Sequence, residues 1–383
     1  MDLTDVRHIA EEDYSAWTKR VTPQPGDIVF TYEATLNRYA IIPEGFRGCL
    51  GRRTALIRPN PDAVNSRFLF FYFFSEDWRK TIGSNILSGA TVDRIPLTRF
   101  PTFPITLPER AVQDRIAAIL SAYDDLIENN TRRIKILEEM AQMSYREWFV
   151  NFRFPGHQKV KMMESELGPI PAGWEVARLE NVVDEFIDYR GKTPKKLDGD
   201  WAESGIFALS ALNVKQGRLV NLEKAKFVNE ELYQRWMKSE LRAGDVLMTS
   251  EAPLGEVYFM PETRRYCLSQ RVFAIRSKCE KMQSSLLFFF LSSPEGQEQL
   301  KARASGTTVL GIRQADLRRI PLIQAPVGIQ RQGDSVLRPI LHLIDTIQRK
   351  NHNLRTTRDL LLPKLISGEV SVEAAAEAME QTA

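Results

Sequence analysis

Basic side chains concentrate in one short stretch of this 383-residue chain, residues 189–196, which reads Tyr-Arg-Gly-Lys-Thr-Pro-Lys-Lys. Glycine and proline within a basic run indicate a loop whose backbone can approach a ligand closely. Lysine and arginine could neutralise phosphates there, and a neighbouring Arg, Gln or Asn could contact base edges in a DNA major groove. Other basic residues lie at Lys215, Arg218, Arg47, Arg52 and Arg53. A basic loop alone is most often a solvated surface, so nucleic-acid binding is only a hypothesis at this point.

Motifs for catalysis are absent from the sequence. The triplet Gly191-Lys192-Thr193 has Phe186 at the upstream position where a phosphate-binding loop needs glycine. No glycine-rich dinucleotide motif and no His-Glu-x-x-His pair occurs, and the four histidines are scattered. There is also no Asn/Asp-Pro-Pro-aromatic sequence of the kind with which amino-methyltransferases hold a base. The sequence therefore favours a binding protein and offers no catalytic residue and no metal ligand.

The second half of the chain repeats the first at a constant offset, so that Gly26 recurs as Gly244 and Arg58 recurs as Arg276. The positions of the first copy that recur at this offset are Gly26-Asp27, Thr31, Glu33-Ala34, Leu36, Pro43, Cys49-Leu50, Arg53 and Ile57-Arg58. The segment 88–92 also returns, as residues 305–309. A period this long is outside the roughly 20–50 residues of solenoid repeats. It predicts two similar domains, which suit a ligand with two related halves.

Each copy is predicted to fold as a mixed α and β domain. Short runs rich in β-branched and aromatic residues indicate strands at 27–32, 39–42 and 54–57, with copies at 245–249, 256–260 and 271–275. One helix is expected next in each copy, near 64–81 and near 283–300, with its Phe and Leu side chains in the core. Proline-punctuated strand sequences follow at 103–108 and 320–326.

A long amphipathic helix is predicted after each domain. Apolar residues recur every three or four positions from Ile116 to Trp148 and from Leu337 to Leu365, and each seam contains one asparagine, Asn130 or Asn351. We expect the two helices to pair as a coiled coil, because the pattern is too long for an average ~11-residue helix. The alternative is that each helix packs only on its own domain. A helix of about 35 residues spans roughly 50 Å, so the pair would act as a ruler between the domains.

Composition is that of an ordinary globular protein, with 26% charged and 43% hydrophobic residues. A formal net charge of +3 permits a nucleic-acid partner without requiring one. The longest apolar runs, 68–74 and 286–291, are far shorter than the ~20 residues of a membrane span, and the acidic start resembles no signal peptide. Three cysteines without a Cys-x-x-Cys pair indicate a reducing cytoplasm, without disulfides or structural zinc.

An ordered set of motifs extends over nearly the whole chain, at residues 107–116, 145–157, 168–176, 189–194, 209–214 and 244–247. This set resembles the specificity subunits of type I restriction–modification systems. Residues 145–157 resemble the central spacer of that family, and residues 168–176 and 189–194 resemble the opening of its second recognition domain. The order of these motifs is far more specific than any one of them.

The resemblance implies an α+β protein with two similar α/β target-recognition domains and two long helices paired as an antiparallel coiled coil. Each domain would read one half of a bipartite site in double-stranded DNA, and the helices would set the unread gap. The chain would be a non-catalytic, cytoplasmic subunit with no membrane contact. It would dock two modification (methyltransferase) subunits through the outward helix surfaces and residues 148–155, and restriction/translocase subunits would join them. S-adenosylmethionine, ATP and Mg²⁺ would be cofactors of those partners, and this chain would bind none.

The resemblance also implies domain ranges and candidate DNA-binding residues. The ranges are 1–107 for the first target-recognition domain, 108–155 for the central spacer helix, 156–325 for the second domain, 326–368 for the C-terminal spacer helix and 369–383 for a flexible tail. The candidates are polar residues in expected loops: Tyr32, Asn37, Arg52, Arg53, Arg190, Lys192, Lys195, Ser269, Gln270, Arg271 and Arg313.

One departure from the family pattern concerns the first domain. The second copy begins near Gly168, and at the constant offset of the repeat its equivalent in the first copy would lie well before Met1. We therefore expect the first domain to lack its opening strands, to leave a sheet edge uncovered and to read its half-site weakly.

Two other functions remain as alternatives. A single-chain DNA methyltransferase or nuclease would bind S-adenosylmethionine by itself, and a coiled-coil adaptor with no DNA role would not explain the two repeated domains.

Overall fold

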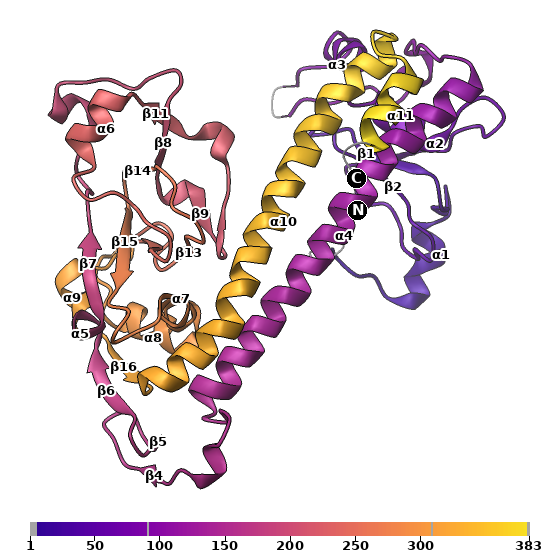
Figure 1. The fold of residues 1–383 in the computed structure, drawn as a ribbon. Helices are drawn as coiled ribbons and strands as arrows, with labels where there is room; N and C mark the ends of the chain where they lie inside the picture. Colours follow the sequence, from indigo (N-terminus) through magenta and orange to yellow (C-terminus); the bar gives the residue numbers. More distant parts are fainter. Residues whose placement is uncertain (1–5, 90–91, 308, 381–383) are drawn as a thin grey trace. The chain divides into compact units, whose positions relative to one another are not determined.

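The computed structural model describes residues 6–89, 92–307 and 309–380, and the chain forms two compact units. Unit 1 combines Met1–Thr131 with Lys350–Ala383, and unit 2 is Arg132–Arg349. Each unit therefore contains one copy of the repeated domain together with part of both long helices (Figure 1). The repeat of 88–92 as 305–309 includes residues 90, 91 and 308, which lie outside the described residues.

Unit 1 contains a three-stranded antiparallel sheet in the order β2-β1-β3. The central strand β1 (Ile28–Thr31) lies between β2 (Tyr39–Ile41) and β3 (Thr54–Ile57), with Ile28 and Phe30 on its buried face. The other short elements are η1 (Glu11–Asp13), α1 (Tyr14–Trp17), α2 (Ser66–Tyr72), α3 (Glu76–Gly83) and η2 (Phe100–Thr102).

Unit 2 contains the same sheet with one strand more. Strand β12 (Val246–Thr249) lies between β13 (Val257–Phe259) and β15 (Val272–Ser277), and β7 (Val183–Ile187) pairs with the far side of β15. The strand registers agree between the copies. Ile28 faces Ile41 and Ile57, and its counterpart Val246 faces their counterparts Phe259 and Ile275. The sequence repeat is thus confirmed as a repeat of structure, residue by residue.

A second sheet, β11-β8-β14, completes the domain of unit 2, and its β14 and β8 are parallel. The strands are β8 (Ile206–Leu209), β11 (Lys226–Val228) and β14 (Cys267–Leu268). The remaining elements of unit 2 are η3 (Arg146–Val150), η4 (His157–Lys159), β4 (Met162–Met163), β5 (Ile170–Pro171), β6 (Glu175–Arg178), α5 (Leu179–Val182), η5 (Pro194–Leu197), η6 (Ala211–Asn213), β9 (Val214–Lys215), β10 (Arg218–Leu219), η7 (Leu222–Lys224), α6 (Glu230–Trp236), α7 (Ser284–Ser292), α8 (Pro294–Ala302), α9 (Gln314–Arg318) and β16 (Pro321–Gln324).

The two long helices are α4 (Arg110–Tyr145) and α10 (Val327–Ser367), and each passes through both units. In unit 1 the first part of α4 and the last part of α10 share one apolar core, which includes Leu120 and Leu365. In unit 2 the last part of α4 packs on the first part of α10 through Ile134, Ile344 and Ile347. The predicted antiparallel pairing of the helices is therefore confirmed (Figure 1).

A buried glutamine joins each long helix to the domain before it. Gln113 accepts a hydrogen bond from the Asn65 amide at 3.0 Å and donates one to the Pro108 carbonyl at 2.9 Å. Gln330 likewise accepts from the Gln283 amide at 3.0 Å and donates to the Ala325 carbonyl at 2.7 Å. Each glutamine is 1% exposed, so its amide would be costly to bury without these partners.

Two helices stand where one was expected in each copy. The expected helix 64–81 is interrupted between α2 and α3, and Ser75 caps α3 by accepting from the Trp78 amide at 3.2 Å. The expected helix 283–300 is interrupted between α7 and α8, where Ser293 accepts from the Gly296 amide and Pro294 opens the new helix. In each copy a serine N-cap therefore begins a second helix. In α8 a proline in the first turn also favours this new start. The predicted burial of the Phe and Leu residues is confirmed for Phe68, Leu69 and Leu287, among others.

The proline-punctuated sequences differ between the copies. Residues 320–326 include β16, which pairs with β6, whereas residues 103–108 form no strand, contrary to prediction. A strand needs a partner for its backbone groups, and the described part of unit 1 offers no counterpart of β6 or β7. For the same reason β3 has a single strand neighbour among the described residues.

The tail also differs from the expectation that it would be flexible. Residues Val372–Glu380 form α11, with Ala375 only 2% exposed within the core of unit 1. Val370, Val372 and Ala376 pack against the same core, and Arg115 of α4 pairs with Glu373. Alanine and glutamate favour helix, and one apolar face was enough to dock it.

Candidate nucleic-acid interface

A polar groove of about 900 Å³ lies in unit 2, at the end of the sheet where β12 leads into Glu251 and β15 begins. The loop before α9 and the first turn of α9 close its other side. Its polar lining consists of Asp188, Arg190, Ser250, Glu251, Gln270, Arg271, Ser305, Arg313, Gln314 and Arg318. Four of the sequence-predicted residues therefore meet here, namely Arg190, Gln270, Arg271 and Arg313.

A buried ion pair fixes the opposite end of the same strands. Asp245, 1% exposed, accepts from Nε and Nη2 of Arg276 at 2.9 and 2.8 Å, and Arg276 also pairs with Glu185 of β7 at 2.9 Å. In unit 1 Asp27 accepts from Arg58 in the same way, at 2.8 and 2.7 Å. A buried carboxylate needs such a partner, because isolating the charge would be costly. The pair sets the register of β12 and β15, and thereby the place of the groove residues.

The groove arginines differ in how firmly they are held. Arg190 donates to both oxygens of Asp188, at 2.9 and 2.6 Å, and lies 5.0 Å from the Phe273 ring centroid. Arg318 lies 4.4 Å from the centroid of Phe186. Stacking and bidentate pairing hold these two guanidinium groups in fixed orientations. Arg313, by contrast, is exposed at the start of α9.

A second depression, of about 540 Å³, adjoins the groove, and Gln270 lines both. It contains Lys195 and Ser269, two further predicted residues, together with Lys224 and Lys226. Lys226 lies 4.9 Å from the Trp201 ring centroid, so a basic and aromatic surface extends the groove. Cations beside aromatic rings suit a polyanion whose bases can stack.

The four predicted residues of unit 1 gather at the corresponding end of its sheet. Tyr32 follows β1 and donates from its hydroxyl to the Arg52 carbonyl at 3.2 Å. Arg53 lies 3.6 Å from Glu33, and the Asn37 side chain accepts from the Tyr39 hydroxyl at 3.1 Å. The structure therefore brings these residues to one end of the sheet.

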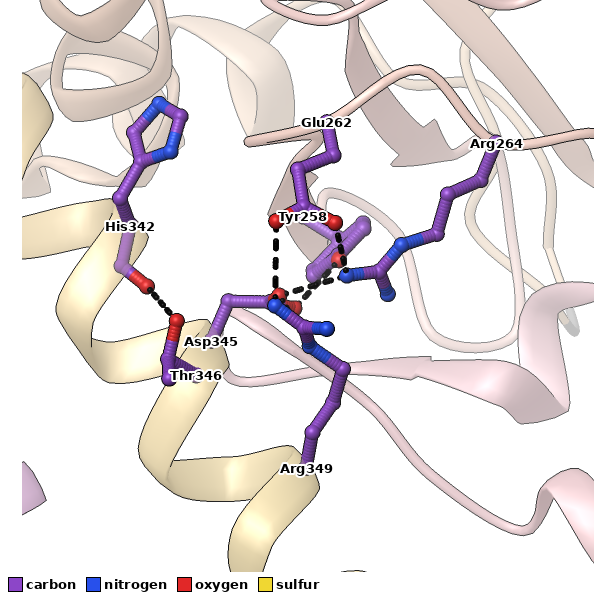
Figure 2. Close-up of polar contacts among 7 residues, drawn as sticks. All are labelled: Tyr258, Glu262, Arg264, His342, Asp345, Thr346 and Arg349. Carbon is purple, nitrogen blue, oxygen red and sulfur yellow. Dashed lines mark hydrogen bonds and ion pairs between the residues drawn. The ribbon is translucent and has the colours of Figure 1, made fainter.

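A cluster around Asp345 attaches the domain of unit 2 to α10 (Figure 2). The buried carboxylate of Asp345 accepts from the Tyr258 hydroxyl at 3.0 Å, from Arg264 at 2.8 Å and from Arg349 at 3.0 Å. Glu262 receives hydrogen bonds from the same two arginines, at 3.1 Å each. Burial raises the pKa of the Tyr258 phenol, so it remains a donor to Asp345.

Comparison with known families matches two stretches, residues 5–139 and 171–356, to the type I restriction modification DNA specificity domain. Together they cover most of the chain and both repeated copies.

The chain belongs to this family.

Relatives of this specificity-domain chain extend over nearly its full length. The specificity subunit of the type I restriction enzyme MjaIX of Methanocaldococcus jannaschii is 25% identical over 369 residues, 96% of this chain and 82% of the relative. The specificity subunit of the EcoBI enzyme of Escherichia coli is 22% identical over 348 residues, 86% of this chain and 70% of the relative. The crystal structure of the S subunit of a type I restriction-modification system from M. genitalium superposes with a TM-score of 0.60 at 15% identity, over 91% of this chain and 84% of that one. That structure therefore shares the fold.

Among the predicted residues in unit 2 of this specificity-domain chain, Lys192 lines neither the groove nor the depression beside it. Its ammonium donates to the Trp236 carbonyl at 2.9 Å and lies 4.4 Å from the Tyr189 ring centroid. Burial, with a contribution from Lys238, lowers the pKa of Lys192. This lysine therefore fastens the basic loop to α6.

Sequence reasoning missed several residues that line the groove, above all Asp188, Glu251, Gln314 and Arg318. Two of them, Asp188 and Glu251, are acidic. The sequence repeat could have indicated Glu251, because Glu33 recurs as Glu251 just as Arg53 recurs as Arg271. Arg318 lies on a short helix that the pattern did not indicate.

The described ranges, 6–89, 92–307 and 309–380, contain neither a candidate metal site nor a candidate membrane span. No group of three or more His, Cys, Asp or Glu side chains there could hold a metal ion. Nor is any helix in those ranges long and apolar enough to cross a membrane.

Proposed function

We propose that this chain is the DNA sequence-recognition subunit of a type I restriction–modification complex and has no catalytic activity of its own. Each domain would read one half of a bipartite site in double-stranded DNA. The observation that carries the proposal is the duplication itself. Two domains of one family-matched chain share a strand register, a buried Asp–Arg pair and a polar edge beside the sheet.

The groove of unit 2 would read the second half-site. Exposed cations such as Arg313 and Lys195 suit phosphates, which position a protein on DNA without carrying sequence information. Gln270 and Arg271 have side chains that can form two hydrogen bonds to one base edge, Gln with adenine and Arg with guanine. In unit 1, Tyr32, Asn37, Arg52 and Arg53 would have the equivalent task.

The long helices would set the number of unread base pairs, since a helix adds about 1.5 Å per residue.

The long helices would also bind the two modification subunits. Ile136, Met140 and Met143 are 55%, 47% and 59% exposed, and their spacing places them on one face of α4. Residues 148–155, our other expected docking region, suit this role less well. Trp148, Phe149 and Phe152 pack against Phe154 and Trp174 within unit 2. S-adenosylmethionine, ATP and Mg²⁺ would be bound by the modification and restriction/translocase subunits.

The test is co-expression with the modification subunit of the same system, followed by sequencing of methylated adenines in the cells. The proposal predicts co-purification and methylation at a split site, two short sequences around a fixed gap. Methylation at a single short sequence or at a palindrome would mean that the first domain does not read DNA. Absence of a complex and of methylation would overturn the proposal.

The competing class, a single-chain methyltransferase or nuclease, makes a different prediction. Calorimetric titration of the purified chain with S-adenosylmethionine should give no binding heat if catalysis belongs to partner subunits. Saturable binding by the chain alone would favour the enzyme.

A further inference from the structure

Each domain has a partly exposed glutamate–arginine pair at the same end of its central strand. Glu251 and Arg271 lie 3.2 Å apart in unit 2, and their repeat counterparts Glu33 and Arg53 lie 3.6 Å apart in unit 1. We propose that Glu251 is a positioning residue that holds Arg271 for contact with a guanine in the second half-site, and that Glu33 and Arg53 form the same device in the first domain. The inference rests on the proposed function and names residues that determine its specificity.

The backbone around the pair is repeated as closely as the side chains. The Ser250 amide donates to the Arg271 carbonyl at 2.8 Å, and the Tyr32 amide donates to the Arg53 carbonyl at 3.2 Å. The residue after each glutamate is an alanine with positive φ, 48° for Ala252 and 66° for Ala34. Alanine is disfavoured in that region, so the turn is held by its surroundings.

A loop closes over each glutamate in the same manner. Glu251 forms a β-bridge with Gly311, and Glu33 forms one with Arg94. Arg271 itself has φ of 65°, a left-handed conformation that is uncommon for arginine and recurs at functional sites. The pair is thus fixed from both sides at the mouth of the groove.

Stability does not explain the pair. The side chains of Arg271 and Glu251 are 50% and 40% exposed, and ion pairs so open to water contribute little to folding. Electrostatic attraction to DNA does not explain the glutamate either, because a carboxylate in the groove repels phosphates. A carboxylate in this position is accounted for if it orients its partner, Arg271.

Guanine is the base that this geometry fits. Arginine presents a planar fork that matches the N7 and O6 acceptors of guanine, and a carboxylate at its side restricts the rotation of that fork. Asp188 holds Arg190 in the same groove in a comparable way, with both carboxylate oxygens engaged. The ion pair between Glu251 and Arg271 has its shortest contact at Nε of Arg271, 3.2 Å from the carboxylate.

The experiment compares Glu251→Gln with the unaltered chain, each in complex with the modification subunit. Sites are selected from a random duplex library, and affinity is measured for a duplex without a site. Loss of a negative charge should leave binding to the site-free duplex unchanged or tighter. At the same time, preference for one guanine of the second half-site should fall roughly 10- to 100-fold. Arg271→Lys keeps the charge but not the fork, so it should lose the same guanine preference.

Glu33→Gln is the matched control, since it alters the equivalent residue of the other domain and must leave the second half-site profile unchanged. The inference is overturned if Glu251→Gln raises affinity for all duplexes and keeps the guanine preference. It is also overturned if preference falls equally at every position together with the unfolding temperature. If the unaltered complex selects no bipartite site, the proposed function itself is wrong.

Discussion

Asn130 donates a hydrogen bond to Asn351 across the paired helices, with 2.9 Å between Nδ2 and Oδ1. Asn351 in turn donates to the Ile127 carbonyl at 3.3 Å, and both side chains are buried. By the offset that relates Gln113 to Gln330, Asn130 corresponds to Ile347 and Asn351 to Ile134. A polar pair at one place and an apolar pair at its equivalent give the helix pairing a defined register.

Replacing one asparagine of this pair should cost more than replacing both. In Asn351→Ile, Asn130 is left buried without its acceptor, and we expect a loss of about 1–3 kcal/mol in unfolding free energy. In Asn130→Ile the loss should be smaller, because Asn351 keeps the Ile127 carbonyl. The double variant should approach or exceed the original stability. Urea unfolding of the four proteins measures the coupling, and additive losses would contradict the pairing.

Asp345→Asn should weaken the attachment of the second domain to α10. The substitution removes the charge that Arg264 and Arg349 share and leaves two cations around a neutral amide. We expect a loss of about 2–4 kcal/mol, as for other broken buried pairs. Thermal unfolding measures it, and Glu262→Gln, at a half-exposed neighbour of the same arginines, should have a much smaller effect. Equal effects of the two variants would mean that Asp345 is not the centre of the cluster.

The repeated Asp–Arg pair should be more important in the second domain than in the first. Arg276 is 13% exposed and also pairs with Glu185, whereas Arg58 is 46% exposed. We therefore expect Asp245→Asn to cost about 2–4 kcal/mol and Asp27→Asn clearly less. Urea denaturation of the two variants compares them directly, and the reverse order would contradict this ranking.

Cys267 should resist thiol reagents until the second domain unfolds. The side chain is fully buried, and burial raises the pKa of its thiol from 9.0 to about 12, so the reactive thiolate is scarce at neutral pH. Because the folded pKa is raised, this group stabilises the fold fully below pH 9 and loses that contribution as pH rises towards 12. Mass spectrometry after alkylation should find exposed Cys279 labelled first. Rapid native labelling of Cys267 at pH 8 would count against the packing.

Arg313 and Arg190 line one groove but should respond differently to alanine. Exposed Arg313→Ala should weaken DNA binding by the complex and, as a phosphate contact, reduce the slope of affinity against salt by about one. Arg190→Ala should lower the unfolding temperature as well, because it removes the guanidinium group that pairs with Asp188 at the groove wall. Salt titrations and thermal scans of both variants separate the roles, and an unchanged salt slope in Arg313→Ala would exclude the phosphate contact.

The sequence predicted what its periodicity encodes. The constant offset of the repeat predicted the shared strand register, and the apolar seams predicted both long helices and the buried Asn130 and Asn351. The helix breaks at Ser75 and Ser293 were not predicted, because capping depends on local hydrogen bonds between a serine side chain and the backbone. The spacing of apolar residues does not show these hydrogen bonds. The prediction of a strand at 103–108 was wrong, because a strand forms only where a partner strand, often distant in sequence, is present.

The site was harder to predict, because polarity and loop position do not say which way a side chain points. Arg190 and Lys192 are two residues apart in one basic run. One stacks over Phe273 in the groove, whereas the other donates to the Trp236 carbonyl. For the same reason polarity and loop position did not indicate the acidic groove residues Asp188 and Glu251.

The division of unit 1 between the two ends of the chain affects how a ribosome can make this protein. Its core joins Phe68 and Leu120 to Leu362, Leu365 and Ala375, so the first domain cannot complete its core until the last helices have been translated. At about 5–20 residues per second, the interval between Thr131 and Lys350 lasts roughly 10–45 s. Unit 2, which is continuous in sequence, is complete as soon as Arg349 has been translated. The nascent first domain meanwhile exposes apolar surface, and it is therefore the part of the chain that most needs a chaperone during synthesis.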